Sequence, residues 1–272
     1  MLIRVGYEIE LSFPQPTAVI LTLHVHQDRA GSIRTPEQLT VEPYVPMSSY
    51  TDSFGNWCDR LFVTSGRMIV RNNAVVEDSG LPDVQNWNAI QHPVQDLPDE
   101  TLLFLLASRY CEVDSELKDI AGSMFNSTTP GWPRVQAICN FVKQHLHFNY
   151  MNARSNRTSL EAYRERSGVC RDFTHLAITL CRCMNIPARY CTGYLGDIGV
   201  PVSADPMDFS AWFEAYIGGT WYAFDPRNNI PRIGRILMAR GRDAADAALT
   251  TTFGLSRLES FKVWTDEVTS LS

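Results

Sequence analysis

Cys170 lies where the stretch SGVCRDFTHLAITLCRCMNIP changes from turn residues to a helical pattern. On a helical wheel at about 100° per residue, Cys170 shares a stripe with the apolar residues that follow, whereas His175 and Arg182 lie on a non-core arc. A cysteine in the first turn of a helix faces unpaired backbone N–H groups and the positive end of the helix dipole. Both lower the pKa of a thiol and favour the nucleophilic thiolate. The alternative is that Cys170 is a small core residue, as most free cysteines are.

A second stretch, SAWFEAYIGGTWYAFDPRNN, predicts two strands joined by a two-residue Gly-Gly turn. Counting back from the turn places Ser210 and Asp225 diagonally on one face, about 7–8 Å apart. An imidazole at position 210 would reach the Asp225 carboxylate, but a serine hydroxyl is too short to do so directly. The same face carries Trp212, Tyr216 and Trp221, which we expect to line a cleft.

The two stretches resemble the motifs of a known family. SGVCRDFTHLAITLCRCMNIPARYCTGYLG looks like the nucleophile segment of bacterial transglutaminase-like proteins, which have the papain-like cysteine fold. The second stretch resembles the segment that in this family usually reads His-Ala-Trp, then Glu, then Phe-Asp-Pro. The resemblance implies that Cys170 is the nucleophile and that Asp225 orients the base. The catalytic histidine of the family aligns with Ser210, which has no suitable pKa for general acid–base catalysis.

No other histidine has a positive argument for replacing the missing base. His175 lies on the non-core arc of its helix, and a structural role is favoured for it. His145 and His147 lie where a predicted helix runs into HFNY, a segment that is able to line the cleft. The remaining histidines are His92 in a connector and His24 and His26 on a predicted strand, where a partly exposed strand face is preferred to half of a metal site.

The chain predicts an α+β fold with two regions. Residues 1–95 read as short strands without helical period, typical of a small β-sandwich domain, and DSFGN resembles part of the β domain that precedes the core in this family. Residues 96–272 are expected to form the papain-like transglutaminase core, with helices packed on an antiparallel sheet and closing C-terminal strands. Within the core, ETLLFLLASRYC and WPRVQAICNFVKQHLHF predict helices, and Pro133 fits a first helical turn.

The composition of the chain indicates which binding partners and which cellular compartment to expect. The 272 residues carry a net charge of −6, which argues against nucleic acid or an anionic membrane as the main partner. No transmembrane helix or signal peptide is expected, and seven cysteines, an odd count, suggest reduced thiols in a cytoplasm. We expect no cofactor and no metal, since neither a nucleotide-binding glycine motif nor a calcium loop is present.

Three hypotheses follow for function. The first is a cysteine peptidase, amidase or acyl transferase that acts on peptide or glutamine-type amides through a Cys170 thioester. The second is a catalytically degenerate relative that binds a peptide or protein partner in the retained cleft. The third, weaker one is a redox or acyl-acceptor thiol at Cys170 that needs no general base. The first is preferred slightly, because Cys170 and Asp225 are both present.

Overall fold

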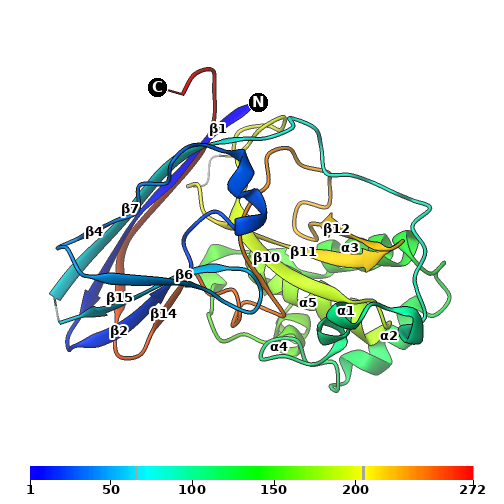
Figure 1. Ribbon diagram of the computed structural model, residues 1–272. Helices are drawn as coiled ribbons and strands as arrows, with labels where there is room; N and C mark the ends of the chain where they lie inside the picture. Colours follow the sequence, from blue (N-terminus) through cyan, green and yellow to red (C-terminus); the bar gives the residue numbers. More distant parts are fainter. Residues whose placement is uncertain (65, 204–205, 272) are drawn as a thin grey trace.

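The computed structural model describes residues 1–64, 66–203 and 206–271. A strand-rich region and a mixed helix and sheet region lie side by side, with the two chain termini close together (Figure 1). The mixed antiparallel architecture predicted from the sequence is confirmed, as is the β-rich N-terminal region. Among the described residues, no helix has the length and apolar character needed to cross a membrane.

The strand-rich region consists of two antiparallel sheets. One has the order β15-β1-β7-β3, with β4 also paired to β7, and the other has the order β14-β2-β6-β5. Alternate residues of β1 point into the core between them, which matches the alternation of its sequence. The strands are β1 (Leu2–Phe13), β2 (Thr17–Leu21), β3 (Ile33–Thr35), β4 (Thr40–Glu42), β5 (Met47–Thr51), β6 (Trp57–Val63), β7 (Gly66–Glu77), β14 (Thr250–Thr252) and β15 (Arg257–Val268).

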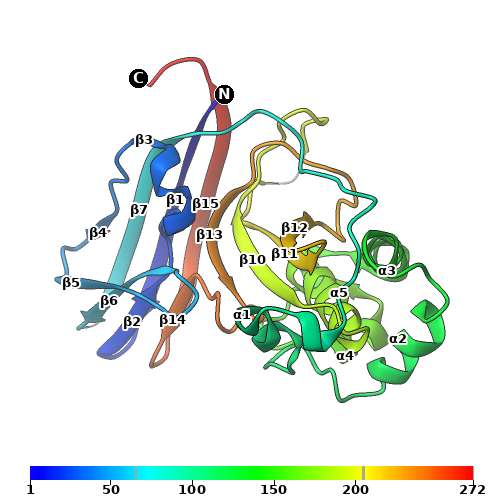
Figure 2. The same ribbon diagram turned by 45° about the vertical axis from the view of Figure 1, so that its right-hand side comes forward.

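The last two strands complete this region rather than the core, where we expected them. β15 pairs antiparallel with β1 from Leu2↔Val268 to Ser12↔Arg257, and β14 pairs with β2. The physical reason is that β1 pairs with β7 along one edge only, so that its other edge would be unpaired without β15. Figure 2 shows β15 beside β1, with the chain returning from the core to the N-terminal sheets.

The core is built on a four-stranded antiparallel sheet of order β12-β11-β10-β13. Its strands are β10 (Ala188–Tyr194), β11 (Ser210–Ile217), β12 (Thr220–Phe224) and β13 (Ile236–Gly241). Short parallel strands β8 (His147–Phe148) and β9 (Ser167–Gly168) lie outside it. The predicted hairpin register is confirmed, with Tyr216 opposite Trp221 and Ile217 opposite Thr220.

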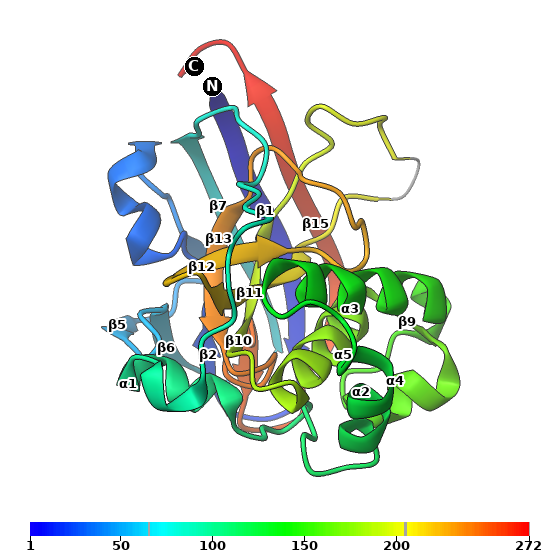
Figure 3. The same ribbon diagram turned by 90° about the vertical axis from the view of Figure 1, so that its right-hand side faces the viewer.

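Helices cover one face of this sheet (Figure 3). Helix α5 (Cys170–Cys183) packs on β10 and β11, and α2 (Leu117–Phe125), α3 (Trp132–His145) and α4 (Ser159–Glu165) pack on α5. The other helical elements are α1 (Asp99–Leu102) and the 3-10 turns η1 (Gln27–Ser32), η2 (Val94–Asp96), η3 (Leu103–Leu105) and η4 (Tyr150–Asn152). The helix predicted around Pro133 is confirmed as α3. The helix predicted over ETLLFLLASRYC is not continuous, because only α1 and η3 form before the chain turns away at Leu106.

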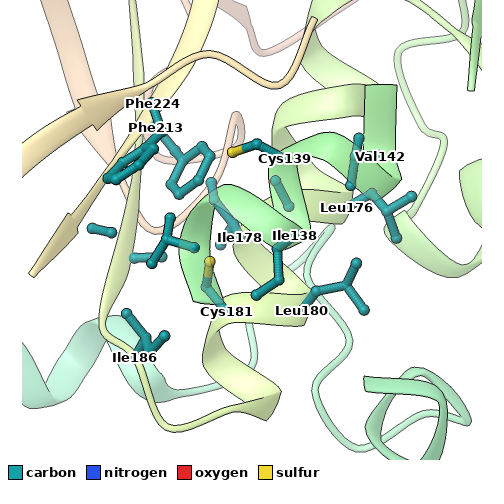
Figure 4. Close-up of a cluster of buried hydrophobic side chains, with 14 of the residues drawn as sticks. Ile138, Cys139, Val142, Leu176, Ile178, Leu180, Cys181, Ile186, Phe213 and Phe224 are labelled. Atoms are coloured by element: carbon teal, nitrogen blue, oxygen red, sulfur yellow. The ribbon is translucent and has the colours of Figure 1, made fainter. Parts of the chain in front are cut away.

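Helix α5 is the centre of the core. Phe213 of β11 and Phe224 of β12 pack with Cys139 of α3 and with Ile178 and Cys181 of α5 (Figure 4). The arc of α5 that we expected to be non-core is also buried. Arg182 is 3% exposed, and its guanidinium donates to the backbone carbonyls of Leu106 and Ala188. A helix that is buried all round is therefore held partly by polar contacts to irregular backbone.

Candidate active site

Cys170 is the first residue of α5, and its turn is fixed by a buried ion pair. Asp172 accepts a hydrogen bond from the Val169 backbone N–H at 2.9 Å and another from Arg157 Nη1 at 2.9 Å. Both charged side chains are almost fully buried. Gly168 is required by close packing, since a Cβ there would lie 2.6 Å from the Asp172 side chain. The sequence before Cys170 therefore folds as a rigid entry to the helix.

Cys170 lies where two cavities meet. One, of about 270 Å³, is partly polar and includes Arg227 and Arg232. The other, of about 420 Å³, lies between the core and the strand-rich region and includes Leu249 and Phe261. Four residues line both cavities, namely Cys170, Asp208, Phe209 and Ser210. The thiol is thus half-buried but reachable from two sides.

The Cys170 thiol is not acidified in this setting, contrary to the expectation from its place at a helix start. Burial raises the pKa of Cys170 to about 11, and the Asp208 carboxylate adds to the rise. Arg227 and hydrogen bonds from the Ala211 and Arg171 backbone act in the opposite direction but do not outweigh burial. Desolvation disfavours the charged form of any thiol, so Cys170 rests as a neutral thiol at neutral pH.

Ser210 is the first residue of β11 and lines both cavities together with Cys170. Its side chain is 7% exposed, and its hydroxyl oxygen has no hydrogen-bond partner among the described residues. Its backbone carbonyl accepts from the Thr192 hydroxyl at 2.9 Å. The structure therefore brings Ser210 and Cys170 to the same place but gives the serine no proton acceptor of its own.

The Asp225 carboxylate makes no hydrogen bond to the Ser210 hydroxyl. Its carboxylate accepts from Arg235 at 3.0 Å, from the Asn228 side chain at 2.8 Å, and from the backbone N–H groups of Arg227 and Asn228. Burial alone would raise the pKa of Asp225, but Arg235 and Asn228 outweigh it and the pKa is lowered. Asp225 lines a separate small cavity of about 40 Å³ beside Cys139. It is an ionised, fully engaged carboxylate in the core.

The three aromatic residues expected to line the cleft lie elsewhere. Trp212 is buried against Cys191 and Leu237, and Tyr216 packs edge-on against Trp221 at 5.3 Å. None of the three lines either cavity at Cys170. The reason is strand alternation, because the odd-numbered residues of β11 face α5 and the even-numbered ones beyond Ser210 cover the opposite face of the sheet.

None of the six histidines, all of which lie in the described part of the chain, lines a Cys170 cavity. His175 is fully buried and stacks on Tyr110 at 5.2 Å, while its Nε2 accepts from the Ala244 backbone at 3.1 Å. This agrees with the structural role favoured for it. His145 lies 2.7 Å from the Tyr163 carbonyl. No imidazole replaces the missing base.

The sequence analysis overlooked two charged residues at the site, Asp208 and Arg227. Asp208 is half-buried and lines both cavities with Cys170, and Arg227 stacks over the Phe148 ring at 3.8 Å while lining one cavity. Burial raises the pKa of Asp208, although the Phe209 backbone N–H and Arg227 oppose the rise. The spacing contained a signal, since residues two apart in an extended segment share a face and Asp208 precedes Ser210 by two.

The chain is similar to a known protein family and to a solved structure. The family model described as the transglutaminase-like superfamily matches residues 118–226, which include Cys170, Ser210 and Asp225. A crystal structure from Cytophaga hutchinsonii, of a protein named as a candidate cysteine protease, superposes with a TM-score of 0.86 and 31% identity. The match covers 99% of this chain and 91% of that one.

Curated bacterial relatives have no described function. An uncharacterized protein of Mycobacterium leprae is 29% identical over 188 residues, which is 66% of this chain and 66% of that protein. An uncharacterized protein of Mycobacterium bovis is 28% identical over 236 residues, with 77% of this chain and 73% of that protein covered. The chain thus spans about two thirds to three quarters of the length of these relatives.

Proposed function

Because this chain belongs to the transglutaminase-like superfamily, we propose that it is a cysteine enzyme that transfers the acyl group of a peptide or glutamine-type amide through a Cys170 thioester. The acceptor is water or an amine. The observation that carries the proposal is the place of the thiol, at the start of α5 and at the junction of two cavities. A buried core cysteine would have no such access.

The surroundings of Cys170 support acyl transfer. The first-turn N–H groups of a helix have no intrahelical partner, and backbone hydrogen bonds from Ala211 and Arg171 reach the sulfur. Donors of this kind stabilise the negative charge that develops on sulfur and on the tetrahedral oxyanion. The two cavities offer room on either side of the scissile bond, one with arginine side chains and one lined largely by apolar residues.

We also assign the chain to the cytoplasm. Its seven cysteines are all unpaired, which suits a reducing compartment. Peptide or protein chains are the proposed substrates, because the cavities meet at Cys170 from two directions.

A second function is favoured by one observation, the raised pKa of Cys170 in a site without imidazole. The same cavities are then a binding site for a peptide or protein, with no turnover. In that case Cys170→Ser would leave the affinity for the peptide unchanged, and there would be no turnover for it to remove.

The test is turnover of a peptide amide library by the wild type, Cys170→Ser and Cys183→Ser. Cys183 is a matched control, since it is half-buried at the other end of α5 and burial raises its pKa to about 11 as well. We expect amide cleavage or amine incorporation by the wild type and Cys183→Ser, and none by Cys170→Ser. Equal turnover in all three proteins would show that Cys170 is not the nucleophile, and peptide binding with no turnover in any of them would reject the enzyme in favour of the binding protein.

A further inference from the structure

The junction of the two cavities holds one thiol, one carboxyl group and one hydroxyl, contributed by Cys170, Asp208 and Ser210. Ser210 has no suitable pKa for proton transfer. The Asp225 carboxylate is engaged by Arg235 and Asn228 and lines a different cavity. Among the residues that the structure describes, Asp208 is therefore the titratable group that lines both cavities with the thiol.

We propose that Asp208 is the acid–base group of this site and takes the place of the family's histidine. The proposal rests on the proposed acyl transfer at Cys170. Asp208 lies two residues before Ser210, so the chain presents its carboxylate on the side of the segment where the family's imidazole would stand. Its carboxyl group lines both cavities together with the Cys170 thiol.

Asp208 and a water molecule are sufficient to carry every proton transfer of the reaction. As the Cys170 sulfur bonds to the amide carbon, the thiol proton passes to the Asp208 carboxylate. The protonated Asp208 then gives this proton to the leaving nitrogen, the C–N bond breaks, and a free amine and a thioester remain. In the second half a water molecule attacks the thioester carbon and gives a proton to Asp208, which returns it to sulfur as the C–S bond breaks.

Two electrostatic features suit this role. Burial raises the pKa of Asp208 above that of an ordinary aspartate, which brings the carboxyl closer to the neutral range in which a general acid works best. The carboxylate also raises the pKa of the Cys170 thiol, so the sulfur keeps its proton until the attack. Thiol deprotonation and carbon–sulfur bond formation then occur together rather than in sequence.

The test compares two acyl donors that share one peptide acyl group, a 4-nitroanilide and a 4-nitrophenyl ester. The nitroanilide nitrogen needs a proton to leave, whereas nitrophenolate leaves without one. Asp208→Asn keeps the shape of the side chain and removes its base. We expect it to slow acylation by the anilide by about 10²–10⁴-fold and acylation by the ester by a smaller factor, because the ester loses the base for the thiol proton but needs no acid for its leaving group. Asp266→Asn, which removes the same charge on the exposed surface of β15, is expected to change neither rate.

A second readout separates a chemical role from a structural one. Removal of the Asp208 charge favours the thiolate, so Asp208→Asn is expected to make iodoacetamide react faster with Cys170 while amide acylation becomes slower. Equal losses with anilide and ester, or unchanged anilide acylation, would overturn the role of Asp208. Absence of any Cys170 adduct in the wild type with both donors would instead reject the proposed acyl transfer itself.

Discussion

The Asp225 carboxylate and the Arg235 guanidinium form a buried ion pair, with Oδ2 and Nη2 at 3.0 Å. Arg235 also holds Asp83 of the connector at 2.8 Å, and Asp83 accepts from the Arg232 backbone N–H. In a site with a histidine at position 210, Asp225 would be expected to orient the ring. Here it ties the end of β12 to the connector that crosses from the strand-rich region.

Removal of Arg235 tests that structural role. Arg235→Met leaves the buried Asp225 and the partly exposed Asp83 without their cation, which is expected to lower the free energy of unfolding by about 3–5 kcal/mol. The measurement is urea unfolding followed by tryptophan fluorescence. Arg257→Met is the control, because the Arg257 side chain is 80% exposed and such a change costs less than about 0.5 kcal/mol. A loss below about 1 kcal/mol for Arg235→Met would contradict the account.

The thiol of Cys170 is expected to react slowly with iodoacetamide at pH 7. A pKa of about 11 instead of 9.0 reduces the thiolate fraction about 100-fold, and the thiolate is the reactive form. The rate at Cys170, measured by peptide mass spectrometry, should therefore keep rising up to about pH 11.

Ser210→His is the companion variant. An imidazolium beside the sulfur favours the thiolate, so the variant is expected to alkylate at least tenfold faster than wild type at pH 7. A wild-type rate that levels off below pH 9, or a Ser210→His rate equal to that of wild type, would show that burial and the absent imidazole do not control this thiol.

Asp172 is expected to stabilise the turn that leads into α5. Asp172→Ala removes the acceptor for the Val169 N–H and leaves Arg157, which is 4% exposed, without its buried partner. We expect a loss of about 2–4 kcal/mol in the free energy of unfolding. Asp119→Ala is the matched control, since Asp119 lies in the first turn of α2 and that helix has no side-chain cap. Equal stability of the two variants would refute the role of Asp172.

The strand-rich region contains a buried charge cluster that makes stability depend on pH. His24 lies 2.7 Å from Asp59 and 3.1 Å from Glu37. Burial lowers the pKa of His24, but hydrogen bonds to the two carboxylates outweigh it and raise the pKa to about 9. A raised folded-state pKa contributes stability that is complete below the unfolded value near 6.5 and is lost as pH rises through 9.

This dependence is checked by urea unfolding of wild type and His24→Gln between pH 6 and 10. The cysteines that are buried in the folded protein also titrate in this range once the chain is unfolded. The informative quantity is therefore the difference in the free energy of unfolding between the two proteins at each pH. We expect the difference to shrink by about 2–4 kcal/mol across the range, whereas His147→Gln, an exposed site, follows the wild type. A difference that does not vary with pH would show that His24, with Asp59 and Glu37, does not make stability depend on pH.

Local patterns in the sequence were enough for the elements that position the site. The Gly-Gly turn determined the β11–β12 register, and the apolar stripe after Cys170 predicted α5. The partner of Asp225 was not predictable, because Arg235 and Asp83 lie in irregular segments whose meeting depends on the tertiary fold. The burial that raises the pKa of Cys170 has the same origin, since the cavity walls come from both regions of the chain.

Local sequence patterns did not predict the pairing of β15 with β1 either. The closing strands were visible in the sequence, but their partner lies some 250 residues away, with Leu2 opposite Val268. Strand periodicity identifies which face is buried and does not identify which neighbour completes the sheet. The β14–β15 region therefore places Leu249, Leu258 and Phe261 in the wall of the apolar cavity, next to Cys170.

The central claim is that Cys170 forms a thioester with amide donors in a site that has no imidazole. The most direct measurement is the mass of the proteolytic fragment that contains Cys170. The fragment is prepared after the wild type has been mixed with peptide amides as acyl donors and the reaction has been quenched in acid. We predict that this fragment gains the mass of the acyl group and loses it on treatment with hydroxylamine, while the Cys183→Ser variant behaves identically. An unmodified Cys170 at every donor concentration and mixing time would contradict the account.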